Sequence, residues 1–122
     1  MKQLRIIVAD DSEPIRNHIV EALTKEGGFM VVGEAVDGSQ AFWLYNRVSP
    51  DVLILDLSMP KASGFEVLET IREKDKSTVI IIFTSDPGLA LRDPCLKAGA
   101  NFYLDKSDLS PLIDICRQLQ QE

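Results

Sequence analysis

The sequence predicts an α/β fold in which a parallel five-stranded sheet lies between two layers of helices. Five short apolar runs alternate with five amphipathic stretches, which is the pattern of repeated βα units. The runs over 52–55 and 79–83 are apolar without interruption, as in strands that are covered on both faces. Polar residues end four of the five runs, so their side chains would gather at one edge of the sheet.

Length and composition fit one globular domain spanning residues 1–122. Hydrophobic residues make up 45% and charged residues 26% of the chain, enough for a single core. The net charge is −6 and no basic cluster is visible, which argues against direct binding of nucleic acid. Neither a signal peptide nor a membrane span is recognisable. Cys95 and Cys116 lack metal-ligand spacing, so we expect buried, reduced thiols in a cytoplasmic protein.

The first two βα units have clear boundaries. A strand over 4–9 leads to a helix that Ser12 caps and that Gly27-Gly28 ends, with Ile15, Ile19, Ala22 and Leu23 at helical spacing on its inner side. A second strand over 30–35 is followed by a turn at 37–39. The helix after this turn has its inner stripe at Ala41, Leu44, Tyr45 and Val48.

The third unit begins with the strand over 52–55, after Ser49-Pro50 has ended the preceding helix. Gly64 precedes a helix with Val67, Leu68 and Ile71 inward. The fourth strand, over 79–83, is the strongest β signal in the chain.

The helix between the fourth and fifth strands is predicted to be short or broken. Pro94 inside a longer helix would cost roughly 3 kcal/mol. If Asp93 is the N-cap, Pro94 becomes the first helical residue of a short helix up to Ala98, and residues 86–92 form a turn or a distorted helical segment. A last strand over 101–105 and a helix that Ser110 caps complete the domain, with Leu112, Ile113, Cys116 and Leu119 inward.

The strand order is taken by analogy. The run over 30–35 is the only one that ends without a reactive or charged side chain, which suits an edge strand away from any site. Doubly wound folds with a flavodoxin-like (βα)5 topology have the order 2-1-3-4-5 and right-handed crossovers. This order places the ends of the first and third strands side by side.

Five polar residues would then meet at the carboxyl ends of the strands: Asp10, Asp11, Asp56, Thr84 and Lys106. Three carboxylates repel one another and cannot all stay ionised without compensation. Oxygen ligands of this density suit Mg²⁺. Asp56 stands alone at the end of a central strand, where it can attack a phosphoryl group. Lys106 and Thr84 can then stabilise the charge of that group.

Six segments in this order resemble a response-regulator receiver domain: Val8-Ala9-Asp10-Asp11, Leu55-Asp56-Leu57-Ser58-Met59-Pro60, Gly64, Phe83-Thr84-Ser85, Lys97-Ala98-Gly99-Ala100 and Tyr103-Leu104-Asp105-Lys106. The resemblance covers nearly the whole chain. It implies that Asp56 accepts a phosphoryl group from a sensor histidine kinase or a phosphotransfer protein. The domain itself would not be an enzyme with a separate substrate.

The same resemblance implies roles for the other residues. Mg²⁺ would be held by Asp11, Asp56 and the backbone carbonyl of Ser58, with Asp10 reaching it through water. Thr84 and Lys106 would bind the phosphoryl oxygens. Tyr103 matches the aromatic residue that turns inward when the threonine moves on activation. Plain core packing is an alternative interpretation of Tyr103 with nearly equal weight.

The chain also departs from the family pattern. Ser107 follows Lys106, whereas the family usually has proline at this position and often a cis peptide bond before it. The isomer of the Lys106–Ser107 bond is therefore open. Ser58 and Asp86 occupy the variable positions that tune phosphoryl lifetime in the family. Pro94 falls in the region that usually forms the output face, made of the fourth helix, fifth strand and fifth helix.

Several alternatives remain at the level of sequence. The chain can be a stand-alone regulator or the N-terminal receiver of a longer DNA-binding transcriptional regulator, and a homodimer on phosphorylation is possible. A haloacid-dehalogenase-type phosphatase would need Asp-x-Asp and a cap domain, and a pseudo-receiver usually lacks a site residue. His18 and Trp43 are expected to be surface residues.

Overall fold

The computed structural model describes residues 3–85 and 89–122, and in them the predicted alternation of strands and helices is confirmed. The elements are β1 (Leu4–Ala9), α1 (Glu13–Glu26), β2 (Phe29–Ala35), α2 (Gly38–Val48), β3 (Val52–Leu55), α3 (Gly64–Arg72), β4 (Val79–Thr84), the short 3₁₀ helix η1 (Leu89–Leu91), α4 (Arg92–Lys97), β5 (Phe102–Asp105) and α5 (Ser110–Gln120). None of the helices in the described residues is long and apolar enough to cross a membrane.

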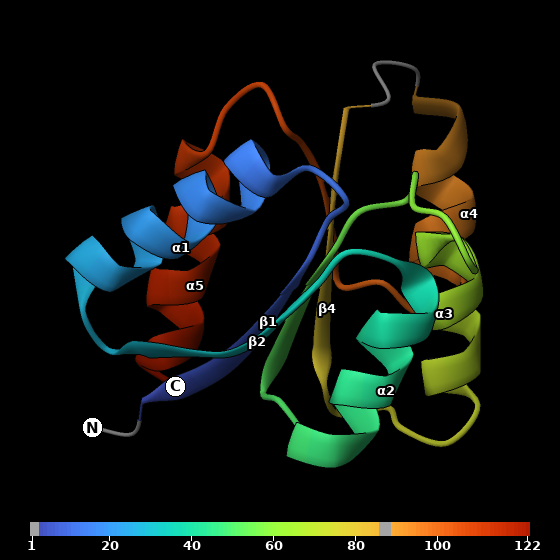
Figure 1. Ribbon diagram of the computed structural model, residues 1–122, viewed down its shortest axis with the longest axis horizontal. Helices are drawn as coiled ribbons and strands as arrows, with labels where there is room; N and C mark the ends of the chain where they lie inside the picture. Colours follow the sequence, from blue (N-terminus) through green and yellow to red (C-terminus); the bar gives the residue numbers. More distant parts are fainter. Residues whose placement is uncertain (1–2, 86–88) are drawn as a thin grey trace.

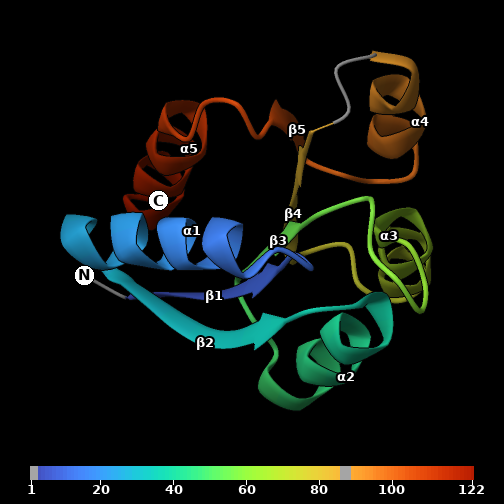
Figure 2. The ribbon, with the colours of Figure 1, turned by 45° about the horizontal axis from the view of Figure 1, so that its top comes forward.

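The five strands form one parallel sheet of order β2-β1-β3-β4-β5, as predicted. Helices α1 and α5 cover one face, and α2, α3 and α4 cover the other, which gives three layers (Figures 1 and 2). Ala9 pairs with Leu55 and Leu55 with Ile82, so the central strands end at nearly the same level. We call this end of the sheet the carboxyl edge and the opposite end the amino edge.

Two hydrophobic cores lie on the two faces of the sheet. Side chains alternate along each strand, so Ile7 and Leu53 face α2, α3 and α4, whereas Ile6 and Ile54 face α1 and α5. Each core contains one cysteine. Cys95 of α4 is buried in the first and Cys116 of α5 in the second, and both are free thiols, as predicted.

Side-chain caps fix where three of the helices begin. The Ser12 hydroxyl accepts a hydrogen bond from the backbone N–H of Ile15, which confirms the predicted cap of α1. Asp37 caps α2 and Ser63 caps α3 in the same way. At the other end of α2, Ser49 adopts a left-handed conformation with φ of 45°, and the helix stops there.

Two predicted caps are wrong. The first helical residue of α4 is Arg92 and its N-cap is Leu91, so Pro94 lies within the first turn, where a missing N–H costs no hydrogen bond. Asp93 is therefore helical, although α4 is short, as expected.

The N-cap of α5 is Leu109, and Ser110 is already helical. The N–H of Ser110 donates to the Asp108 carboxylate at 3.0 Å. Residues 86–88, part of the segment predicted as a turn or distorted helix, lie outside the described residues, whereas 89–91 form the short 3₁₀ helix.

The connection between β3 and α3 is folded tightly against its surroundings. A Cβ on Gly64 would stand 2.1 Å from the Asp56 carbonyl oxygen, and one on Gly38 would stand 1.9 Å from the Ala62 carbonyl oxygen, so both positions require glycine. Lys61 and Ala62 both have positive φ, 52° and 83°. The connection that carries Ser58 therefore holds local backbone strain.

Candidate functional site

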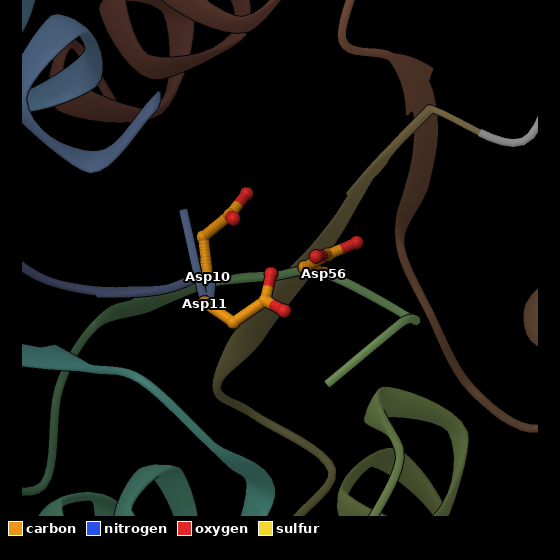
Figure 3. Close-up of side chains that lie close together, drawn as sticks. All are labelled: Asp10, Asp11 and Asp56. Carbon is orange, nitrogen blue, oxygen red and sulfur yellow. The ribbon is translucent and has the colours of Figure 1, made fainter. Parts of the chain in front are cut away.

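The structure brings the three predicted aspartates together at the carboxyl edge. Asp10 and Asp11 follow β1, Asp56 follows β3, and one carboxylate oxygen of each lies within 4.8 Å of the others (Figure 3). The backbone supports this arrangement, because the N–H of Asp56 donates to the carbonyl of Ala9 at 2.9 Å. We call these three residues the acidic cluster.

Lys106 reaches the acidic cluster from the end of β5. Its Nζ lies 2.6 Å from Oδ2 of Asp10 and 3.1 Å from Oδ2 of Asp56. The backbone N–H of Lys106 donates to the carbonyl of Thr84, which ties the end of β5 to the end of β4. One ammonium thus stands between two nearly inaccessible carboxylates, while Asp11 is exposed.

The charges of the site are only partly balanced. Burial raises the pKa of Asp56 above its ordinary value, against the hydrogen bond from Lys106, and the nearby charge of Asp10 raises it further. Burial opposes the charge of Lys106 as well, but its hydrogen bonds to Asp10 and Asp56 outweigh that cost and raise its pKa. A single ammonium does not neutralise three carboxylates, so the cluster has an affinity for further positive charge.

The composition of the cluster fits a hard divalent cation. Its donors are carboxylate oxygens, the ligands that Mg²⁺ takes together with water and phosphoryl oxygens. Asp10 is occupied by Lys106 and by the N–H of Ser12, which donates to its Oδ1 at 2.9 Å. Asp56 is contacted by Lys106 and by the N–H of Ser58 at the longer distances of 3.1 and 3.3 Å. The exposed Asp11 therefore has the greatest free ligand capacity within the cluster.

Thr84, Ser58 and Tyr103 occupy the same edge. Thr84 is the last residue of β4 and is buried, rather than following the strand as predicted. Ser58 is exposed, and its backbone N–H donates to Oδ1 of Asp56 at 3.3 Å. Tyr103 is half-buried, and its ring packs against the core under α2, α3 and α4. The Lys106–Ser107 bond is trans, like every other peptide bond in the described residues.

One residue near the site escaped the sequence reasoning. Arg16 of α1 is buried and donates a hydrogen bond from Nη1 to the carbonyl of Asp10 at 2.8 Å. The available signal was its spacing: Arg16, Ile19 and Leu23 follow the 3-4 pattern of a buried helix face. His18 and Trp43 are both exposed, as predicted.

A groove of about 500 Å³ lies elsewhere, between α3 and the residue that follows α4. Its walls are Glu66, Glu69, Thr70, Arg72, Glu73 and Ala98. None of these residues belongs to the acidic cluster. The chemistry at the carboxyl edge is therefore separate from this groove.

Comparison with known proteins identifies the family to which the chain is similar. A family model described as the response regulator receiver domain matches residues 6–117. The nitrate/nitrite response regulator protein NarL of Escherichia coli K12 is 34% identical over 116 residues, which cover 95% of this chain and 53% of that protein. The chain spans about half the length, or less, of the first curated relatives that it matches.

Solved structures agree with this assignment. A two-component response regulator of the LuxR family from Aurantimonas sp. SI85-9A1 superposes with a TM-score of 0.90 at 31% identity, over 98% of this chain and 86% of that one. The match in a CheX–CheY–BeF3–Mg²⁺ complex from Borrelia burgdorferi has a TM-score of 0.87 at 28% identity, over 93% and 86% of the two chains.

Proposed function

This chain belongs to the response regulator receiver domain family of two-component systems, and from that premise we propose that it is a phosphoacceptor. Asp56 would take a phosphoryl group from a sensor histidine kinase or a phosphotransfer protein. The observation that carries the proposal is the convergence of Asp10, Asp11 and Asp56, with the ammonium of Lys106 bound to Asp10 and Asp56.

The proposed reaction is a transfer between two side chains. An ionised oxygen of Asp56 forms a bond to phosphorus as the bond from phosphorus to the donor's imidazole nitrogen breaks, and the electron pair stays on that nitrogen. Lys106 lies beside the attacking carboxylate, where its ammonium can stabilise the negative charge of the transferred phosphoryl group. The buried Thr84 at the end of the adjacent strand β4 would donate its hydroxyl to a phosphoryl oxygen.

We propose that Mg²⁺ binds at the acidic cluster. Asp11, Asp56 and the backbone carbonyl of Ser58 would hold the ion, and Asp10 would reach it through water. When bound, the ion supplies charge neutralisation for the phosphoryl oxygens. Before the donor arrives, Lys106 would offset part of the repulsion between Asp10 and Asp56.

Phosphorylation would act as a switch through Thr84 and Tyr103. The added negative charge attracts the Thr84 hydroxyl, and Tyr103 lies on the adjacent strand β5, paired with Ile82. The inward packing of its ring is compatible with either proposed role, switch or core residue. The output surface would be α4, β5 and α5, through which the domain binds a target or forms a homodimer.

The broader setting is also a proposal. The elements run from Leu4 to Gln120, so we assign residues 1–122 to the receiver. The family match supports a cytoplasmic location for it. Because NarL is about twice as long, this domain can be the N-terminal receiver of a DNA-binding regulator, with no direct nucleic-acid contact of its own. The family match gives no support to the phosphatase, and a pseudo-receiver would be expected to lack one of the site residues.

A phosphorylation assay tests this function. Incubation with acetyl phosphate and Mg²⁺ should add one phosphoryl group to the chain, detected by intact mass, and Asp56→Asn should abolish the addition. Asp105→Asn is the matched control, because Asp105 is exposed at the same edge of the sheet. Equal modification of wild type and Asp56→Asn would contradict the proposal.

A further inference from the structure

The buried guanidinium of Arg16 links helix α1 to the backbone of the acidic cluster. The residue is 9% exposed, although α1 is an otherwise amphipathic helix on the surface of the sheet. A buried charge needs polar partners. Arg16 has two: the main-chain carbonyl of Asp10 at 2.8 Å and the carboxylate of Glu34 on β2, 3.4 Å from its Nε.

The contact with Asp10 fixes a particular peptide plane. The carbonyl that Arg16 binds belongs to the peptide between Asp10 and Asp11, so its orientation determines where the chain enters Asp11. On the preceding side, the N–H of Asp10 donates to the carbonyl of Ala35 at 2.9 Å. The backbone of Asp10 is thus held at both its N–H and its carbonyl, from β2 and from α1.

Asp11 is exposed, and no residue within 3–85 or 89–122 restrains its side chain in a comparable way. The direction of its side chain depends on the preceding peptide, because rotation of that plane moves the Cα and Cβ of Asp11. From these contacts we propose that Arg16 is a positioning residue that aims Asp11 into the cation site. This inference rests on the proposed binding of Mg²⁺ and concerns how the chain shapes that site.

The electrostatic effect of Arg16 has the opposite sign. A positive charge near a cation site disfavours the cation, so removing it should tighten Mg²⁺ binding if charge were its only influence. Loss of positioning should weaken binding, and residues that orient metal ligands typically contribute 10- to 100-fold in affinity. The direction of the change therefore separates the two roles.

The experiment measures Mg²⁺ affinity by titration calorimetry on the unphosphorylated protein. Arg16→Met and Arg16→Lys should each weaken binding about 10-fold. The lysine variant should not rescue it, since the lysine ammonium ends one bond short of the Nη1 that holds the Asp10 carbonyl. Glu34→Gln removes the charge of the other partner of Arg16 and should leave the affinity within about twofold of wild type. Ile19→Val, on the same face of α1, controls for general loosening of the helix.

Unchanged or tighter binding in Arg16→Met would overturn the inference, as would full rescue by Arg16→Lys. Far-UV circular dichroism and urea unfolding identify any variant that has not folded. If Arg16→Met does not fold, the comparison of Arg16→Lys with Glu34→Gln still decides the result. A wild-type chain that binds Mg²⁺ but takes no phosphoryl group on Asp56 would contradict the phosphoacceptor proposal alone.

Discussion

The two edges of the sheet treat a carboxylate in opposite ways. At the amino edge, Asp75 accepts hydrogen bonds from the side chains of Tyr45, Ser77 and Thr78 and from the backbone N–H groups of Ser77 and Thr78. At the carboxyl edge, the partners of Asp56 among the described residues are Lys106 and the N–H of Ser58. The hydrogen bonds of Thr78 and Tyr45 lower the pKa of Asp75, whereas burial raises the pKa of Asp56.

This difference separates structure from function within one fold. Asp75 is saturated with donors, and it raises the pKa of Tyr45, which burial had already raised, to about 12. Asp10 and Asp56 are buried, and in the described part of the chain each has fewer donors than Asp75. The amino edge therefore stabilises the domain, whereas the carboxyl edge gives up stability for the cation and phosphoryl binding that we propose there.

The largest expected effect on stability comes from removing the guanidinium of Arg72 at the amino edge. Arg72 is buried and donates to the carbonyls of Gly99 and Asp75 and to the Asn101 side chain, at 2.9 to 3.0 Å. Arg72→Met should lower the free energy of unfolding by about 3 kcal/mol, because a buried guanidinium and its three part-buried hydrogen bonds are lost together. Urea unfolding measures it.

Arg47→Met is the matched control for this variant. Arg47 is exposed and lies over the ring of Trp43, 4.7 Å from its centroid, so its loss should change stability little. If both variants lose the same small amount, the amino edge does not have the stabilising role assigned to it here.

The next effect concerns Asp75 itself. Asp75→Asn should cost about 2 kcal/mol, because hydrogen bonds to a charged acceptor become weaker and some lose their acceptor. The folded-state pKa of Asp75 is lowered, so its contribution is complete above the unfolded value near 4 and is lost as pH falls through the lower, folded value. The gap in stability between wild type and variant should shrink in urea titrations below about pH 4. A gap that stays constant with pH would exclude this role.

At the carboxyl edge the sign should reverse. The pKa of Asp56 is raised in the folded chain, so ionisation of this carboxyl is less favourable there than in the unfolded chain. The ionised carboxylate therefore reduces the stability of the fold at neutral pH. Asp56→Asn should therefore raise the free energy of unfolding by about 1 kcal/mol without Mg²⁺. Millimolar Mg²⁺ should stabilise wild type more than the variant. Thermal melts with and without the ion test both statements, and a destabilised variant would show that Asp56 is held like Asp75.

A smaller gain is expected from the strained connection beside the site. Ala62→Gly removes a left-handed strain of roughly 1–2 kcal/mol but restores backbone freedom to the unfolded chain, which offsets much of it. A net stabilisation of about 0.5 kcal/mol should appear in the urea midpoint. No gain would indicate that the connection is relaxed and that the carboxyl edge stores no strain there.

Most of the fold could be predicted because the runs that form β3 and most of β4 are apolar without interruption and the helices carry regular apolar stripes. β3 has the predicted bounds, and β4 differs only by including Thr84. Helix starts were less predictable where two polar residues compete. Ser110 is a good cap by residue type, but Asp108 satisfies its N–H and the helix begins one residue earlier.

The acidic cluster and Lys106 could be located because each residue stands at the end of its strand. The buried arginines could not, since charged residues are ordinarily assigned to the surface. Arg16 and Arg72 both lie on the inner faces of their helices, beside Ile19 and Leu68 respectively, and each binds main-chain carbonyls far from its own turn. Such contacts depend on tertiary packing that spacing alone does not reveal.

The separate placement of the two thiols has a practical consequence. Burial raises the pKa of Cys95 and, to about 12, that of Cys116, so neither thiol forms the reactive thiolate while its core stays closed. Alkylation at neutral pH therefore requires local opening, and peptide mass spectrometry distinguishes the two sites. Cys95 reports opening beneath α4 and Cys116 opening beneath α5, so the native chain carries an internal probe for each side of its sheet.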